Sequence, residues 1–135
     1  MSYADKLEAF RALFETHHNE RLARLFPNLP HETIGVEQGY KFDKVFVNAG
    51  NGQRMGRYMV ESRTGNIYGI KSWTQVNKRR LYGTLDSVDQ YDWSDFYARA
   101  LPGTDAEVKH YEREAEIKSK QKRRGRKPRA AALTP

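Results

Sequence analysis

The chain contains no cysteine among its 135 residues, which excludes a disulfide framework, a thiolate nucleophile, an iron–sulfur site and a cysteine-based zinc site. It contains no run of about 18 apolar residues, so we expect no membrane-spanning helix and no membrane partner. The N-terminus lacks the basic and then apolar order of a secretory signal, and we expect the protein to stay in the compartment where it is made. This length is enough for one hydrophobic core and too short for two.

Acidic residues are missing from one segment, which carries the whole positive charge of the chain. Eight of the 24 Lys and Arg residues lie within residues 118–129, and this stretch has no Asp or Glu. The other 16 basic residues are balanced by 17 acidic ones, so the formal net charge of +7 comes from this stretch. We call it the basic segment; its candidate binding residues are Lys118, Lys120, Lys122, Arg123, Arg124, Gly125, Arg126, Lys127 and Arg129.

Residues 3–26 show the periodicity of an amphipathic helix. Apolar residues recur at steps of three and four: Leu7, Phe10, Leu13, Phe14, Leu22, Leu25 and Phe26. Ser2 and Asp5 form a capping pair at the start, and the prolines of residues 27–30 end the helix because proline cannot donate to the helical ladder. The polar stretch 15–21 leaves two interpretations open, one helix or two shorter ones.

The middle of the chain has the pattern of β-strands. Three aromatic and β-branched runs are separated by clusters of turn-forming residues; the runs are 40–47, 57–61 and 67–71. Three runs joined by two short turns predict an antiparallel meander, covered on one face by the N-terminal helix. Residues 81–85 are either a fourth strand or an irregular loop.

Two helices are expected in the C-terminal third. Residues 92–101 have the pattern of a short helix with Asp92 as its N-cap. Thr104 and Glu107 form a capping box that begins a second helix over residues 104–124. Acidic residues come first and basic residues last in this second helix, an order that suits the helix dipole.

The second helix carries pairs of opposite charge at the favourable spacing of four residues, Glu114 with Lys118 and Glu116 with Lys120. Its apolar content is thin, which indicates that it projects from the body of the protein. Gly125 and Pro128 predict its end, and the residues that follow are expected to be disordered in isolation.

These elements predict an α+β fold: an N-terminal helix packed on a three- or four-stranded antiparallel sheet, a charged helix and a disordered basic tail. The predicted division is a single small α+β domain over residues 1–103, the charged helix over 104–124 and the tail over 125–135.

The basic segment has the composition of a polyanion-binding element, because Lys and Arg gain affinity for phosphates by releasing condensed counterions. Its Arg124-Gly125-Arg126 step resembles the Arg-Gly-Arg-Pro core of an AT-hook, in which glycine lets the backbone approach the floor of a narrow minor groove. Here Lys127 stands between that step and Pro128. The resemblance implies contact with DNA. Two alternatives stay open, an acidic protein partner and a segment that only raises solubility.

A secondary basic patch lies in the middle of the chain and consists of Lys71, Lys78, Arg79 and Arg80. Trp73 and Tyr82 flank it, and cations interleaved with aromatic rings are typical of surfaces that bind single-stranded nucleic acid. The alternative, which we favour, places both aromatic side chains in the core and pairs the cations with nearby carboxylates. These carboxylates recur at every third residue: Asp86, Asp89, Asp92 and Asp95.

No pattern typical of a catalytic or metal site is present. The four aspartates lack the alternate spacing and the glycine of an EF-hand loop, which indicates a solvated acidic face. Residues 50–56 are rich in glycine, but no helix pattern follows to bind a pyrophosphate, so a hairpin loop is expected. The histidines show neither i,i+4 pairing nor a ligand set; they are His17, His18, His31 and His110. We therefore predict no catalysis, no cofactor and no metal.

Residues 57–73 (Arg-Tyr-Met-Val-Glu-Ser-Arg-Thr-Gly-Asn-Ile-Tyr-Gly-Ile-Lys-Ser-Trp) resemble a hairpin found in small bacteriophage and environmental-virus proteins of unassigned function. In those proteins a valine-rich strand leads into a Thr-Gly-x-Ile/Leu turn and ends in Ser-Trp, and Lys71 stands here where alanine is usual. The resemblance implies a viral or phage origin. It places the protein in a host cytoplasm or a virion, or in the nucleus of a eukaryotic host, where the basic segment would pass for an import signal.

The function predicted from the sequence is non-catalytic association with nucleic acid, with the basic segment binding the phosphate backbone. Both DNA and RNA remain open, as does the oligomeric state. The alternative is a protein–protein interaction module, such as a virion component or a host-interaction factor, whose basic segment contacts an acidic partner.

Overall fold

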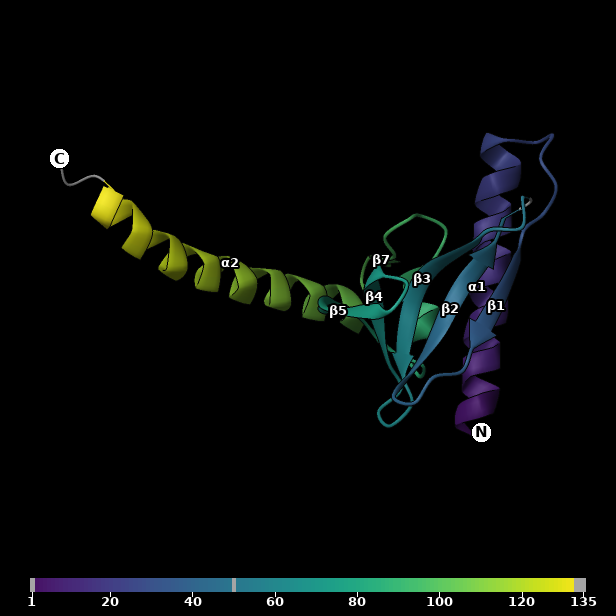
Figure 1. The fold of residues 1–135 in the computed structure, drawn as a ribbon, viewed down its shortest axis with the longest axis horizontal. Coiled ribbons are helices and arrows are strands. Elements are labelled where there is room, and N and C mark those ends of the chain that lie inside the picture. Colours follow the sequence, from purple (N-terminus) through teal and green to yellow (C-terminus); the bar gives the residue numbers. More distant parts are fainter. Residues whose placement is uncertain (1, 50, 133–135) are drawn as a thin grey trace.

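The computed structural model describes residues 2–49 and 51–132, with side chains described through residue 120. It contains an N-terminal helix, a five-stranded antiparallel sheet, a two-stranded ribbon and a long C-terminal helix. Helix α1 lies along one face of the sheet, and helix α2 extends away from the body (Figure 1). The predicted α+β class is confirmed, with five strands in the main sheet where the sequence predicted three or four.

Helix α1 (Tyr3–Leu25) is a single unbroken helix. Its predicted capping pair is present: the Asp5 N–H donates to Ser2 Oγ over 3.2 Å, and the Ser2 N–H donates to the Asp5 carboxylate over 3.4 Å. The polar residues 15–21, where the sequence allowed a break in the helix, include two side chains that bind the backbone at the start of β1 (Thr33–Glu37). Glu15 accepts the Ile34 N–H at 2.9 Å, and Asn19 exchanges two hydrogen bonds of 2.8 Å with the Glu32 backbone.

The main sheet is an antiparallel meander whose strands neighbour one another in chain order. The strands are β1 (Thr33–Glu37), β2 (Phe42–Asn48), β3 (Arg54–Glu61), β4 (Asn66–Ser72) and β5 (Gln75–Thr84). The ambiguous residues 81–85 thus mostly belong to a strand. Its pairing with β4 shifts register three times, and these bulges interrupt the alternation by which a strand is recognised in a sequence. Strand β1 is short and lies outside the three runs that predicted strands.

The glycine-rich run between β2 and β3 forms the expected hairpin loop rather than a nucleotide-binding turn. Gly52 has a φ of 85°, a backbone angle that residues with a side chain rarely adopt. Gly50 lies outside the described residues.

The prediction of a short helix over residues 92–101 is wrong. A 3₁₀ turn (Val88–Gln90) leads into β6 (Tyr91–Asp92), which pairs with β7 (Arg99–Ala100). Trp93 explains the difference, because it is fully buried and its ring N–H donates to the Val88 carbonyl over 2.9 Å. Asp92 is not a helix N-cap; its carboxylate accepts the Ser94 N–H at 3.0 Å in a local turn.

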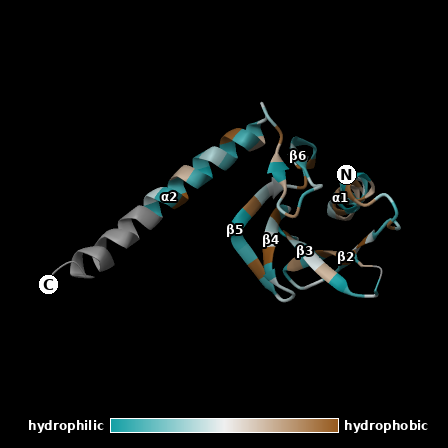
Figure 2. Ribbon diagram, turned by 90° about the horizontal axis from the view of Figure 1, so that it is seen from above, coloured by the Kyte–Doolittle hydropathy of each residue, from teal (hydrophilic) through white to brown (hydrophobic). Residues whose placement is uncertain are grey.

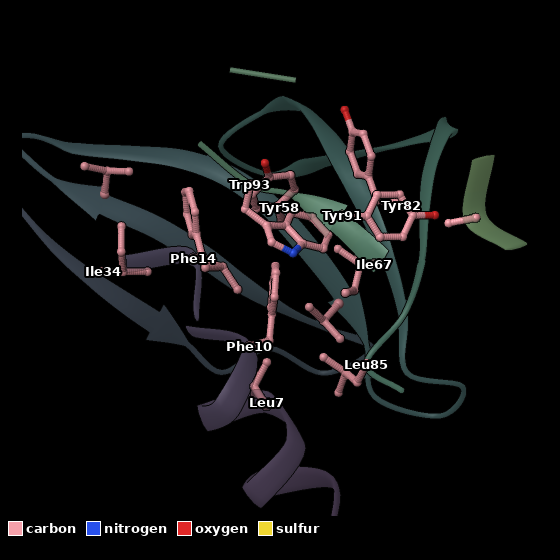
Figure 3. Close-up of a cluster of buried hydrophobic side chains, with 14 residues drawn as sticks. Leu7, Phe10, Phe14, Ile34, Tyr58, Ile67, Tyr82, Leu85, Tyr91 and Trp93 are labelled. Atoms are coloured by element: carbon pink, nitrogen blue, oxygen red, sulfur yellow. The ribbon is translucent and has the colours of Figure 1, made fainter. Parts of the chain in front are cut away.

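The core lies between α1 and the sheet and is closed by Trp93 (Figure 3). The indole centroid lies 4.7 Å from Phe10, 5.3 Å from Tyr58 and 5.2 Å from Tyr91. The contacts with Phe10 and Tyr58 are edge-to-face, and such contacts add to the free energy gained by burying the rings.

Only the first half of the apolar stripe of α1 contributes to this core. Leu7, Phe10 and Phe14 are buried, whereas Leu25 and Phe26 are exposed. The periodicity therefore identified the helix correctly but overstated how much of it the sheet covers.

Helix α2 (Asp105–Ala132) begins at the predicted Thr104, whose hydroxyl accepts the Glu107 N–H at 3.3 Å. The return contact of a capping box is displaced by one residue, since Glu107 accepts the N–H of Gly103. Of the two predicted ion pairs, Glu116–Lys120 forms at 3.2 Å. No Glu114–Lys118 pair forms in the part of the chain whose side chains are described.

The helical backbone of α2 continues through Gly125 and Pro128, where the sequence predicted its end. In a helix, glycine costs about 1 kcal/mol and proline about 3 kcal/mol relative to alanine. The neighbouring Lys, Arg, Gln and Ala residues are strong helix formers and favour continuation. The predicted end at residue 124 is corrected to Ala132. Residues 133–135 lie outside the described residues, and disorder of the tail in solution stays a prediction.

Candidate nucleic-acid interface

The four cations of the secondary basic patch lie on the hairpin of β4 and β5. Lys71 is near the end of β4, and Lys78, Arg79 and Arg80 follow one another in β5. All four side chains are exposed. The hairpin brings Lys71 and Arg80, which are nine positions apart in the sequence, into the lining of one pocket.

The two aromatic residues that flank this patch differ in burial. Tyr82 is buried in the core, as predicted, but Trp73 is 37% exposed, so its placement in the core was wrong. Trp73 stands in the turn between β4 and β5, where the sheet ends. Its ring lies 5.9 Å from Phe46, and Lys44 Nζ lies 3.8 Å from the ring centroid. Phe46 alternates with the core residue Val45, so this contact is on the sheet face opposite α1.

The carboxylates that were expected to neutralise the patch bind other partners. Asp86 pairs with Lys6 at 2.8 Å, and Asp95 pairs with Arg21 at 3.2 Å. Across the described side chains, no Asp or Glu lies within ion-pair distance of Lys71 or residues 78–80. The positive charge of the patch is therefore not neutralised by an ion pair with any of the described side chains.

A groove of about 710 Å³ separates β5 from the first turns of α2. The segment that joins β6 to β7 forms its third side. Its lining includes four tyrosines, Tyr82, Tyr91, Tyr97 and Tyr111, and five cations against three carboxylates. The cations are Arg79, Arg80, Arg99, Lys109 and Arg113, and the carboxylates are Asp95, Glu107 and Glu114.

Arg113 fixes α2 against the sheet. One guanidinium nitrogen donates to the Leu81 carbonyl over 2.7 Å and another donates to the Arg79 carbonyl over 2.8 Å. Figure 2 shows α2 leaving the body beside β5 and β6. Arg113 thus joins the backbone of the secondary patch to the helix that carries the basic segment. The sequence pointed to neither Arg113 nor Tyr97, because their roles depend on contacts between distant parts of the chain.

Burial changes the ionisation of the tyrosines beside the groove. Burial raises the pKa of Tyr82, and nearby Arg80 partly opposes this shift. Burial likewise raises the pKa of Tyr91, which Arg113 partly opposes. Both hydroxyls therefore stay neutral at physiological pH and add no negative charge to the groove.

The basic segment itself occupies the distal part of α2. Lys118 and Lys120 are exposed on this helix. The remaining side chains of the predicted site lie outside the described residues: Lys122, Arg123, Arg124, Arg126, Lys127 and Arg129.

The described side chains contain no cluster of three His, Asp or Glu groups that could hold a metal ion. His17 accepts the Trp93 N–H through Nδ1 at 3.1 Å, and His18 lies 2.8 Å from a Glu32 oxygen. Both histidines thus make hydrogen-bond contacts within the body of the protein. No described helix has the length and apolar composition to cross a bilayer.

Comparison with protein-family models, with curated proteins and with solved structures found no match to this chain.

Proposed function

We propose that this protein associates with nucleic acid without catalysis and that the basic segment of α2 supplies most of the affinity. The observation that carries the proposal is the anchoring of α2 by Arg113, after which the helix leads the basic segment away from the body (Figure 1). A 28-residue helix is about 42 Å long at 1.5 Å per residue. This reach lets the distal cations contact phosphates while the body contacts the same strand closer to the sheet.

The energetic basis is the release of counterions. Each phosphate neutralised on duplex DNA contributes about −0.9 to the slope of log K against log salt. The eight cations of the basic segment therefore limit its share to a slope of about −7, and partial engagement would give roughly half of that. Such binding tolerates any sequence, because phosphates carry no base information.

The experiment compares the full chain with a variant in which the six cations from Lys122 to Arg129 are replaced by glutamine, a residue that keeps the helix. Fluorescence anisotropy with labelled DNA and RNA over a range of salt gives the affinity and the slope. We expect weaker binding on every sequence and a slope flatter by up to about 5.

Two double variants provide a matched control, because each removes two cations. Lys122→Gln with Arg123→Gln should flatten the slope by up to about 2, whereas Lys41→Gln with Arg63→Gln, on turns of the sheet, should leave it unchanged. Equal binding by the wild type and the six-glutamine variant would refute the proposal, as would absence of binding at about 50 mM salt.

The AT-hook resemblance is tested separately with Gly125→Ala. Alanine stabilises a helix by about 1 kcal/mol over glycine and holds the backbone away from the floor of a minor groove. If Arg124 and Arg126 enter that groove, this variant should weaken A·T-rich sites more than G·C-rich ones. An equal loss of affinity on both kinds of site would leave only contact with the backbone phosphates.

The second candidate function is interaction with a protein, in keeping with the viral or phage setting proposed from the hairpin. It is favoured by exposed apolar side chains at the end of α1, where Leu25, Phe26 and Phe96 line a shallow pocket of about 190 Å³. A protein partner at this surface would be lost on replacing Phe26 by serine, whereas nucleic-acid binding would not change.

A further inference from the structure

A pocket of about 240 Å³ lies next to the groove, at the end of the sheet where β3 begins and β4 ends. Three cations line it, Arg57, Lys71 and Arg80, and no acidic residue is among the described residues of its lining. Gly69 makes room there, since a side chain at this position would stand 3.0 Å from Arg80 Cβ. Tyr82, Phe96 and Tyr97 complete the walls.

The charge of this pocket is not neutralised within the protein. None of its three cations forms an ion pair with a carboxylate over the stretches whose side chains are described. Arg57 donates one hydrogen bond of 3.1 Å, to the backbone carbonyl of Asp95, and its Nε has no partner within the same stretches. Like charges held at one small pocket repel one another, so an anion bound there would relieve the repulsion.

Exposed aromatic rings stand beside these cations. Phe96 is 61% exposed and Tyr97 is 49% exposed, with their ring centroids 4.8 Å apart. Arg57 lies 4.9 Å from the Phe96 ring, and Arg80 lies 3.9 Å from the Tyr97 ring. The arginines hold these rings in place while much of each ring surface stays open to solvent. A cation next to an open ring face is the combination that binds a phosphate and stacks the adjoining base.

We propose that this pocket binds an unpaired nucleotide of single-stranded nucleic acid, with Arg57, Lys71 and Arg80 at the phosphates and Phe96 and Tyr97 stacking on bases. Bases in a duplex are already stacked and paired, so they cannot use these rings. The inference rests on the proposed function. It adds a preference for single strands, which phosphate binding by the basic segment does not by itself provide.

The test compares two labelled oligomers of about 15 nucleotides, in the range of site sizes for single-strand binding surfaces. One is oligothymidylate, and the other is an abasic strand of the same length that keeps the phosphates and lacks the bases. The wild-type chain should bind oligothymidylate about 5-fold or more tightly than the abasic strand. A duplex of the same length should bind more tightly than the abasic strand only to the extent that its higher charge density explains.

Substitutions in the full chain assign the preference to the pocket. Phe96→Leu and Tyr97→Leu should each weaken oligothymidylate binding about 5-fold or more and leave abasic binding unchanged, while Tyr97→Phe should retain the preference. Arg80→Gln should weaken both strands, because it removes a phosphate contact. Tyr40→Leu is the matched control, since Tyr40 is 95% exposed and lies outside the pocket.

The outcomes separate this inference from the proposed function. Equal binding of oligothymidylate and the abasic strand by the wild type would overturn the inference and leave the proposed function intact. A base preference that survives in the six-glutamine variant, with unchanged affinity, would support the pocket and refute the role of the basic segment. Competition by polyglutamate as strong as by oligothymidylate, with no effect of Tyr97→Leu, would overturn the pocket in favour of an acidic protein. A parallel titration with oligouridylate distinguishes RNA from DNA as the source of the bases.

Discussion

Replacing Phe14 by alanine should be among the most destabilising single changes in the body of this protein. The ring is 0% exposed and packs edge-to-face against Tyr58 at 5.2 Å, with the Arg57 guanidinium 5.5 Å from its centroid. Loss of a buried phenyl group costs about 2–3 kcal/mol of transfer free energy, and the aromatic contact adds about 0.5–1.5 kcal/mol. Together with the cavity left behind, the expected loss is about 3–5 kcal/mol.

Urea titration followed by near-ultraviolet circular dichroism measures this loss, which should appear as a lower midpoint at an unchanged slope. The melting temperature should fall by about 12–20 °C, at about 4 °C per kcal/mol for a domain of this size. Phe26→Ala is the matched control, because Phe26 belongs to the same predicted stripe and is 54% exposed. It should cost less than about 1 kcal/mol. A loss below about 1 kcal/mol for Phe14→Ala, or equal losses for both variants, would refute the packing argument.

Three further predictions follow from burial and hydrogen bonding. In a Trp73→Phe variant, the emission left from the fully buried Trp93 should be blue-shifted and resist acrylamide; strong quenching would contradict its place in the core. Because burial raises the pKa values of Tyr58, Tyr82 and Tyr91 above the unfolded value of about 10, stability should be fully present below about pH 10 and fall as the pH rises further. Tyr58→Phe should lessen this fall and cost little at neutral pH, since its hydroxyl has no partner within the described residues; urea midpoints across pH test both statements. Arg113→Ala removes two hydrogen bonds between α2 and β5 and should speed amide exchange in the first turns of α2 about tenfold, whereas unchanged exchange would mean that other contacts hold the helix.

Local patterns in the sequence were sufficient for the elements whose signals are short-range. The Ser2–Asp5 capping pair and the three- and four-residue steps of residues 3–26 specify α1 through its own backbone and faces. Runs of β-branched and aromatic residues between turn clusters likewise specify the central strands. Thr104 marks the start of α2, because a capping hydroxyl acts within one turn.

Contacts between distant residues decided what the local patterns left open. Residues 92–101 have helical periodicity, yet Trp93 is drawn into the core between α1 and the sheet, and the segment pairs as β6 and β7 instead. Bulges in β5 hide its alternation, so only its pairing with β4 identifies it as a strand.

The candidate site shows the same division. Composition alone located the basic segment and the cations at 78–80, because net charge needs no fold to be recognised. The sequence also placed Trp73 in the core and paired the cations with the aspartates, and both expectations required knowing which side chains meet. The fold instead directs Asp86 to Lys6 and Asp95 to Arg21, and it brings Arg57 to Phe96 and Arg80 to Tyr97. Such pairings join residues far apart in the chain, and they arise only once the packing of the core has fixed the positions of the strands and loops.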